Sequence, residues 1–434
     1  MTFGNVVRGL SFQILLVAMP SFASVTTEAF NARCVSVKAG RGVVRILHFG
    51  DSHLAAPSGH GSFARNLQHL LGDGGDGFGL PWVFPRAGLK AQCSPGWRKS
   101  ARARNPVRLG LSGGQMEASA LGEWARLEGD FSRIRLYGLK SPGGGRLHIQ
   151  VDGQGVGTLD LEGPSGTPAV FRADVPVPRV QPASGRRLEI RNTRPGRCLL
   201  TGVALERGTG VVYSPIAFNG ARASWMLEVP EASLRAQLGA EAPDLIILSF
   251  GTNEANTSPF LPEAYQKGLE DLLVRLMKAA PGARIMLAGP PDGHLRLGTS
   301  ANLDAVISIQ HALAARYSAL FVDQRRTMGG EGSIDSWARE GLANGDLLHL
   351  TAAGYERLSV SVLRSLFPGM EASAPRTVAA LPPANPRSQA PAREESQHWF
   401  YWLRAENGRL IITDDLTRYP GLKVEKRSAS LAGN

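Results

Sequence analysis

The chain is poor in cysteine, with three among its 434 residues, Cys34, Cys93 and Cys198. They allow at most one disulfide and one spare thiol, which excludes a framework of several disulfides. Most of the nine histidines lack metal-ligand spacing with cysteine or acidic neighbours, so we expect no metal and no cofactor. After residue 23 no segment approaches eighteen apolar residues, which predicts a mature chain without a transmembrane segment.

Nucleotide and nucleic-acid binding are also excluded. The glycine-rich segment from Gly72 to Gly79 lacks the Gly-Lys-Ser/Thr ending of a phosphate-binding loop and follows a helix-like stretch. We expect it to form an irregular loop beside the cleft. The net charge is +11 at pH 7, but no helix-turn-helix pattern and no basic motif interleaved with aromatics is present. The charge therefore indicates an anionic environment such as a cell-wall glycan or an envelope surface.

The first residues have the pattern of a signal peptide. Arg8 precedes an apolar stretch from Gly9 to Met19, and small residues follow up to Ala23. The apolar stretch is too short to span a bilayer comfortably. We therefore expect residues 1–23 to be removed after Ala23 and the mature protein to be exported, in a bacterium to the periplasm.

The remaining chain alternates between two patterns. Residues 24–93 and 213–367 show buried strands separated by amphipathic helices, which predicts a doubly wound parallel α/β sheet. Residues 94–212 carry short alternating segments bounded by glycine, which predicts an inserted β-sandwich. This insert is basic, with 18 Lys and Arg against 10 Asp and Glu between residues 94 and 210. Glycan binding and a merely structural role in shaping the cleft are equally compatible with its pattern.

Two segments follow the α/β pattern. Residues 368–397 are rich in Pro, Ala, Ser and Arg, which predicts a flexible linker. Residues 398–434 form a C-terminal tail of unknown role, whose aromatic cluster indicates a small hairpin or a docking peptide.

Three polar motifs stand beside predicted strands or helices. Ser52 follows the apolar run Val43 to Phe49, so it should lie at the carboxyl end of a buried strand, where α/β sheets bind their ligands. Asn253 belongs to a Gly-x-Asn turn after a second apolar run, and Asp346-x-x-His349 precedes the last helix. Each motif alone is better explained as a turn or a helix cap. A serine nucleophile, however, needs a histidine base that a carboxylate orients, and the combination supplies all three groups.

The motifs, in this order, resemble the SGNH branch of the GDSL esterases. The resemblance implies a flavodoxin-like sheet and a catalytic triad of Ser52, Asp346 and His349. It also implies an oxyanion hole made by the backbone N–H groups of Ser52 and Gly220 and the side-chain amide of Asn253. Gly220 is the best match to the family's glycine block, and we expect it to open a helix that runs towards Leu238.

An SGNH domain interrupted by a basic β-sandwich is similar to the bacterial peptidoglycan O-acetylesterases. The resemblance covers roughly residues 40 to 367 and includes Gly329-Gly330-x-Gly332 and Gly341-Leu342-Ala343 before Asp346. It implies a periplasmic serine esterase that removes acetyl from the C6 hydroxyl of N-acetylmuramic acid through an acetyl-enzyme intermediate. It also implies that the insert is like a carbohydrate-binding module. Two alternatives remain, an O-acetyltransferase that acts on an envelope glycan with the same triad, and a non-catalytic glycan-binding scaffold.

Overall fold

The computed structural model describes residues 22–86, 88–101, 110–166, 169–178 and 185–367, and three short strands between 400 and 428. The chain divides into two compact units, Met1–Ala372 and Ser373–Asn434. The predicted signal peptide lies outside the described residues except for its last two, which begin helix α1 (Phe22–Lys38), and so does the predicted linker. In the described part of the chain, no helix is both long and apolar enough to cross a membrane.

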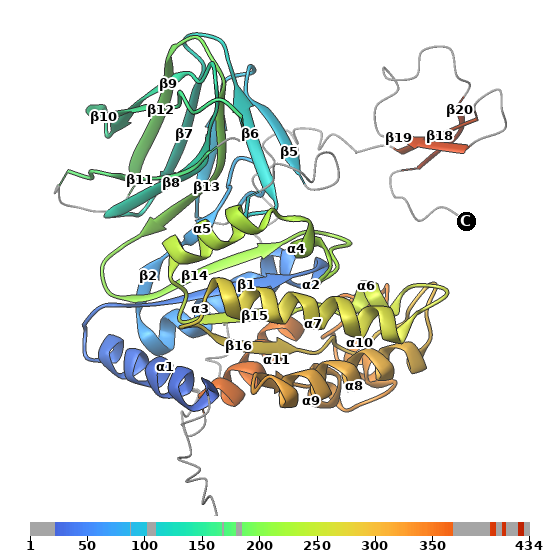
Figure 1. Ribbon diagram of the computed structural model, residues 1–434. Helices are drawn as coiled ribbons and strands as arrows, with labels where there is room; N and C mark the ends of the chain where they lie inside the picture. Colours follow the sequence, from blue (N-terminus) through green and yellow to red (C-terminus); the bar gives the residue numbers. More distant parts are fainter. Residues whose placement is uncertain are drawn as a thin grey trace, which may run out of the picture. The chain divides into compact units, whose positions relative to one another are not determined.

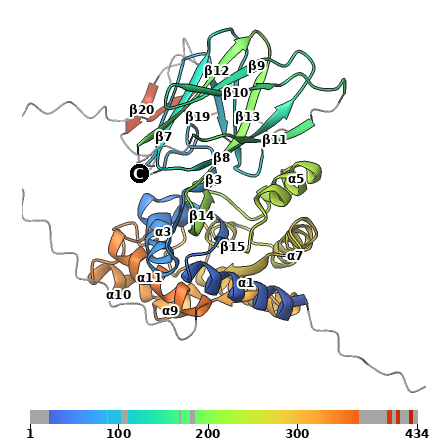
Figure 2. The ribbon, with the colours of Figure 1, turned by 90° about the vertical axis from the view of Figure 1, so that its left-hand side faces the viewer.

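A six-stranded sheet forms the centre of the first unit, and all its strand pairs are parallel. In spatial order its strands are β17 (Leu320–Val322), β16 (Arg284–Ala288), β15 (Leu245–Ser249), β1 (Val43–Gly50), β14 (Gly210–Ala217) and β2 (Asp73–Gly75). The antiparallel strands of the insert lie together on one side of this layer (Figure 1, Figure 2). The predicted doubly wound α/β sheet with an inserted β domain is therefore confirmed.

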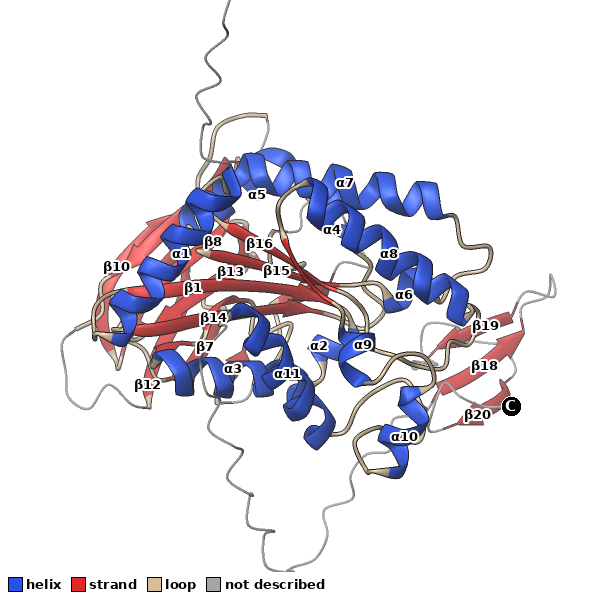
Figure 3. Ribbon diagram, turned by 90° about the horizontal axis from the view of Figure 1, so that it is seen from below, coloured by secondary structure: helices blue, strands red, loops and turns tan. Residues whose placement is uncertain are grey.

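Helices cover both faces of the sheet (Figure 3). On one face lie α1, α3 (Pro57–Leu71) and α11 (Ala352–Leu366), and on the other lie α4 (Trp225–Glu228), α5 (Glu231–Glu241), α7 (Pro262–Ala279) and α8 (Ser300–Arg316). Successive strand residues point to opposite faces, so Ile46 packs with the first group while Leu47 and Phe49 pack with the second. Burial on both faces explains why these strands are continuous apolar runs in the sequence.

Short helices begin directly after three of the parallel strands. They are α2 (Ser52–Ala55) after β1, α6 (Thr252–Ala255) after β15 and α9 (Gln324–Met328) after β17, and α10 (Ser333–Arg339) follows α9. Parallel strands have their carboxyl ends at the same edge, so these helices gather side chains from distant parts of the sequence at one place.

The insert consists of two antiparallel sheets around a separate apolar core. One sheet contains β10 (Gln154–Asp160), β9 (Arg146–Val151), β12 (Arg186–Arg194), β7 (Trp124–Gly129) and β4 (Lys90–Cys93). The other contains β11 (Ala169–Val175), β8 (Arg133–Lys140), β13 (Cys198–Glu206), β6 (Gly114–Ala118) and β5 (Arg98–Ala101), with β3 (Gly77–Gly79) paired to β13.

The structure moves both expected boundaries of the insert, residues 94 and 212. Strand β4 already pairs with β7, so the insert begins at Lys90, while β14 starts at Gly210 and belongs to the parallel sheet. The sequence pattern did not predict the start of the insert at Lys90 because β4 is short and half-exposed. It did not predict the end of the insert before Gly210 because only three residues separate β13 from β14.

The segment Gly72 to Gly79 is not the irregular loop that we expected. It forms β2, which pairs with β14, and β3, which pairs with β13, and so joins the two layers. A Cβ atom at Gly74 would lie 2.9 Å from the backbone of Gly210, and one at Gly75 would lie 2.7 Å from the carbonyl oxygen of Leu205. The glycines are needed because backbones approach each other closely here.

The C-terminal unit contains one antiparallel sheet. Strand β18 (Phe400–Arg404) pairs with β19 (Leu410–Thr413) as the expected hairpin, and β20 (Val424–Ser428) pairs with the other side of β18.

A buried network of charged groups joins the insert to the α/β layer. Arg135 of β8 contacts Glu206 at 2.7 Å and Glu241 of α5 at 3.1 Å, and Arg45 of β1 contacts Glu206 at 2.9 Å. The hydroxyl of Tyr137 donates to Glu241. Both carboxylates are 1% exposed, so their desolvation is offset only while the arginines remain in place.

We expect Arg135→Ala to lower the free energy of unfolding by about 3–5 kcal/mol, because it leaves two buried carboxylates without their shared partner. Urea denaturation followed by fluorescence measures this loss. Arg98→Ala is the matched control, since Arg98 is 78% exposed in its ion pair with Glu117 and should contribute at most about 1 kcal/mol. Equal losses in the two variants would contradict a stabilising role for the buried network.

Candidate active site

Ser52 lies at the turn from β1 into α2. Asp51 caps this helix, and its Oδ1 accepts the backbone N–H of His53 at 3.0 Å. A Cβ atom at Gly50 would lie 2.8 Å from the Cβ of Leu54 and 3.1 Å from the carbonyl oxygen of Ser249. Only glycine fits at position 50, and the tight turn presents Ser52 at the carboxyl edge of the sheet.

The structure brings Ser52, His349 and Asp346 together in one chain of hydrogen bonds. The Oγ of Ser52 lies 2.8 Å from Nε2 of His349, and Nδ1 of His349 lies 2.7 Å from Oδ2 of Asp346. When Nδ1 of His349 carries the ring proton and donates it in a hydrogen bond to Asp346, Nε2 of the same ring is free to accept the proton of Ser52. This is the arrangement that a serine nucleophile and its histidine base require.

The loop between Asp346 and His349 holds the carboxylate in a tight turn. Oδ1 of Asp346 accepts the backbone N–H groups of Leu348 at 3.1 Å and His349 at 3.0 Å. The turn places Leu347 in the left-handed region at φ 52°, and the backbone N–H of His294 binds its carbonyl oxygen at 2.8 Å. Burial raises the pKa of Asp346, but the hydrogen bonds from His349 and Leu348 outweigh burial and lower this pKa below its ordinary value. Asp346 therefore stays ionised at neutral pH.

Asn253 and Gly220 follow the strands on either side of β1. Asn253 lies in α6 after β15, and its Nδ2 donates to the carbonyl oxygen of Ala221 at 3.0 Å. Gly220 follows β14 with φ +74°, a conformation that favours glycine, although a Cβ atom there would meet nothing within 4 Å. The structure thus places both expected oxyanion donors at the sheet edge that carries Ser52.

Gly220 does not open a long helix, which corrects the expectation from the sequence. It lies in a turn, and α4 and α5 begin later, at Trp225 and Glu231. Pro230 separates the two helices because the residue before a proline is pushed towards extended backbone, as observed at Val229 with ψ 127°.

Glu254 is a site residue to which the sequence analysis assigned no role. It is 8% exposed, and its Oε1 accepts the backbone N–H of Ala223 at 2.8 Å. Together with the bond from Asn253 to Ala221, this contact fixes the loop that contains Gly220 to the turn after β15. The only signal in the sequence was its position directly after Asn253.

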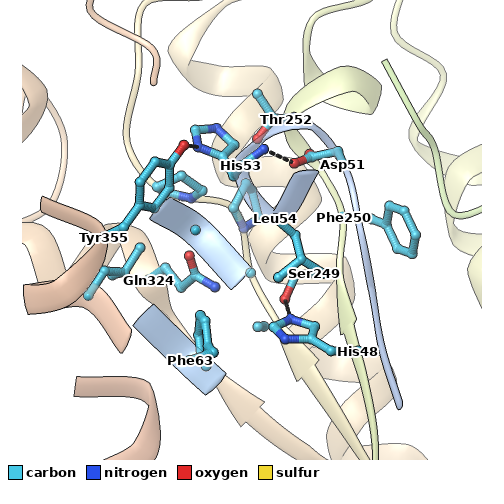
Figure 4. A pocket seen from close by; sticks show the side chains of 16 residues that line it. His48, Asp51, His53, Leu54, Phe63, Ser249, Phe250, Thr252, Gln324 and Tyr355 are labelled. Carbon is cyan, nitrogen blue, oxygen red and sulfur yellow. Dashed lines mark hydrogen bonds between the residues drawn. The ribbon is translucent and has the colours of Figure 1, made fainter. Parts of the chain in front are cut away.

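A cavity lies beside the turn from β1 into α2 (Figure 4). His53 and Tyr355 point towards each other there, with 3.2 Å between Nδ1 and the hydroxyl, and the ring of His53 lies 5.1 Å from that of His349. His48 is buried, and its ring nitrogens contact the hydroxyl of Tyr213 at 2.7 Å and the Oγ of Ser249 at 2.6 Å. Burial lowers the pKa of both His48 and His53 to about 3, so both rings are neutral.

The three cysteines are free thiols. Burial raises the pKa of Cys34 and of Cys198 to about 12, so neither is a competing nucleophile at neutral pH. Within the described ranges, no group of three or more His, Cys, Asp and Glu could hold a metal ion.

The parallel sheet and the arrangement of Ser52, His349 and Asp346 resemble those of SGNH-type ester hydrolases, and comparisons with known proteins agree. Residues 192–357 match the model of the GDSL-like Lipase/Acylhydrolase family. The match includes Gly220, Asn253, Asp346 and His349 but not Ser52, because the insert separates the serine from the rest of the domain. None of the curated proteins matches the chain.

Several solved structures are similar to this chain. A peptidoglycan O-acetylesterase has a TM-score of 0.66 and 24% identity, and the alignment covers 79% of this chain and 96% of that one. A lipase/acylhydrolase from Enterococcus faecalis has a TM-score of 0.30 and 17% identity over 36% of this chain and 76% of that one. A family two carbohydrate esterase from Cellvibrio japonicus has a TM-score of 0.27 and 12% identity over 64% and 98%. The predicted resemblance to the SGNH hydrolases and the prediction of an esterase are confirmed.

We expect Glu254→Ala to lower kcat by about 10- to 100-fold with little change in KM, because the loop that presents Gly220 loses its anchor and oxyanion donors act only in the transition state. Hydrolysis of p-nitrophenyl acetate measures both constants. Glu254→Gln is the matched control, since its amide oxygen can still accept the N–H of Ala223 and should restore most of kcat. A raised KM with normal kcat in Glu254→Ala would contradict this positioning role.

We expect Asp51 to make stability depend on pH. Burial, together with the nearby charge of Glu254, raises its pKa from 3.8 to about 7. Between pH 4 and pH 7 the unfolded chain ionises this residue while the folded chain keeps its proton, so stability falls as pH rises through this window. Asp51→Asn keeps an acceptor for His53 but cannot ionise. Relative to the parent, its free energy of unfolding should therefore rise by about 2–4 kcal/mol from pH 4 to pH 7 in urea denaturation. A constant difference would show that Asp51 titrates near its ordinary value.

Proposed function

We propose that this protein is a serine esterase that removes O-acetyl groups from cell-wall glycan, in particular the acetyl group on C6 of N-acetylmuramic acid in peptidoglycan. The observation that carries the proposal is the hydrogen-bonded chain from Ser52 through His349 to Asp346 at the carboxyl edge of the sheet. The likeness to a peptidoglycan O-acetylesterase, which extends over the insert as well as the α/β domain, supports the choice of substrate.

In the proposed mechanism, Nε2 of His349 takes the proton of Ser52 while Oγ attacks the acetyl carbonyl carbon. The carbonyl oxygen becomes an oxyanion that the N–H groups of Ser52 and Gly220 and the amide of Asn253 stabilise. The intermediate then expels the sugar oxygen, which receives the proton from His349. Water then attacks the acetyl carbon while His349 takes one of its protons, the bond to Oγ breaks to release acetate, and His349 returns the proton to Oγ of Ser52.

We further propose that the insert recognises the glycan polymer. The outward face of its five-stranded sheet carries Trp124, with the guanidinium of Arg126 4.1 Å from the ring centroid. Pairing of β7 with β12 and β4 places Arg191 and Gln92 on neighbouring strands beside them. A flat aromatic ring among hydrogen-bonding groups suits a sugar chain. Ion pairs such as those of Glu189 with Arg126 and Arg191 neutralise part of the insert's basic charge, so recognition would rest on contact more than on net charge.

Release of acetate from O-acetylated peptidoglycan tests the proposed function. The parent should release acetate at the same rate with or without an added sugar acceptor, and Ser52→Ala should release nearly none. Acetyl transfer to the acceptor in place of acetate release would favour the O-acetyltransferase. A parent that hydrolyses p-nitrophenyl acetate but leaves the polymer untouched would reject the glycan as substrate.

Trp124→Ala tests the role of the insert. We expect the ratio of polymer turnover to p-nitrophenyl acetate turnover to fall about 10-fold, because the variant loses a contact of roughly 1–2 kcal/mol with the polymer and no group of the triad. Leu121→Ala is the control, since Leu121 is an exposed apolar residue of the same insert. An unchanged ratio in Trp124→Ala would leave this face without a role in recognition.

A further inference from the structure

A second cavity adjoins the candidate active site. Its volume is about 320 Å³. On one side it is lined by Leu54 and Ala55, which follow Ser52 on α2, and on another by Asn219, the neighbour of Gly220. The cavity wall therefore includes residues that closely follow Ser52 and the residue directly before Gly220.

Most of the cavity wall is apolar. Leu80, Val83 and Phe84 come from the segment that enters the insert, and Phe218 comes from the end of β14. The rings of Phe84 and Phe218 stack with 5.8 Å between their centroids. The cavity thus lies where the insert and the α/β layer meet.

Arg86 also lines this cavity, and burial lowers its pKa more than the nearby carboxylate of Asp76 raises it. Its guanidinium donates to the carbonyl oxygens of Asp76 at 2.6 Å, Phe78 at 2.5 Å and Pro215 at 2.8 Å. All three acceptors are neutral, and no ion pair joins Arg86 to a carboxylate in the described part of the chain. Burial lowers its pKa to about 10, so the group remains charged at neutral pH.

The buried arginines among the described residues form ion pairs, whereas Arg86 is half-buried. Arg135 contacts Glu206 and Glu241, Arg186 contacts Asp152, and Arg325 contacts Asp292, each within 3.1 Å. A buried cation without such a partner is costly unless a ligand supplies the anion. Arg86, like Arg275, instead donates to three backbone carbonyl oxygens, and Arg86 does so in the wall of the cavity.

Gly79 makes the position of this guanidinium possible. A Cβ atom at Gly79 would lie 2.3 Å from Nη2 of Arg86 and 2.6 Å from its Cζ. Any larger residue at position 79 would displace the charged group from β3 and from the cavity wall. The chain thus keeps room for Arg86 at the entrance to the insert.

We propose that this cavity is a subsite for a carboxylate carried by the sugar whose acetyl group is removed, with Arg86 as the residue that recognises it. The inference rests on the proposed function and deepens it. A muramoyl residue carries a lactyl ether that ends in a carboxylate when no peptide is attached, and the stem peptide supplies carboxylates when one is attached. An O-acetylated N-acetylglucosamine carries neither group. The cavity therefore distinguishes the two sugars of the same polymer by charge.

Competition on the parent protein tests the subsite without altering the fold. N-acetylmuramic acid, its uncharged carboxamide, a muramoyl peptide and N-acetylglucosamine are compared as inhibitors of p-nitrophenyl acetate hydrolysis. We expect one of the two carboxylate-bearing probes to inhibit at a concentration about 10-fold or more below the neutral probes, as a charge-assisted hydrogen bond predicts. Inhibition by the free acid assigns the lactyl carboxylate, and inhibition by the peptide alone assigns the stem peptide. Equal inhibition by charged and neutral probes would overturn the subsite.

Substitution of Arg86 provides the second test, with 6-O-acetyl-N-acetylmuramic acid and 6-O-acetyl-N-acetylglucosamine as substrates. Arg86→Gln should reduce the ratio of kcat/KM for the charged substrate to that for the neutral one by about 10- to 100-fold. Arg316→Gln removes the same charge from an exposed site on α8 and should leave the ratio unchanged. A parent that hydrolyses both sugars equally well would reject the subsite and retain the esterase. A parent that hydrolyses neither sugar ester would reject the proposed function itself.

Discussion

The parallel pairing of β1 with both β14 and β15 is the constraint on which the site depends. Their register sets Gly50 level with Ala217 on one side and with Ser249 on the other. Parallel strands end at the same edge, so the residues that follow these three strands are brought together although the first lies more than 160 positions before the other two. Ser52, Gly220 and Asn253 are those residues. The histidine and aspartate reach the same edge from the loop before α11, which packs against α3 and the sheet.

Close backbone contacts and buried ion pairs attach the insert to this sheet. Glycines let β2 and β3 pass close to the backbones of β14 and β13, and buried carboxylates share Arg135 and Arg45 across the boundary. Arg86 holds three carbonyl oxygens at the point where the chain enters the insert. The same junction forms the wall of the cavity beside Ser52. A domain inserted between Ser52 and the rest of the candidate site can therefore shape the cavity beside it.

Helices with a strong hydrophobic periodicity could be predicted from the sequence, whereas strands that need hydrogen bonds from a neighbouring strand could not. The amphipathic helices predicted within residues 213–367 include α7 and α11, because long amphipathic helices have a clear hydrophobic periodicity. Strands β2, β3 and β4 were missed because glycine-rich and half-exposed segments become strands only when a neighbour supplies the hydrogen bonds. The expected helix at Gly220 was wrong because a glycine with positive φ and a later proline interrupt the chain there.

The sequence by itself determined the fold class and the reactive residue types. These are a serine after a buried strand, a Gly-x-Asn turn and an Asp-x-x-His motif, in an order that indicates an ester hydrolase. Residue types and local periodicity are properties of the sequence alone, so these features can be inferred without knowing which distant segments pack together. Only the tertiary structure decided the 2.8 Å contact between Ser52 and His349, the bond by which Glu254 anchors the loop that contains Gly220, and the position of Arg86 in the wall of a cavity. These features depend on which distant segments pack together, and burial then sets the charge and the hydrogen-bond partners of each group.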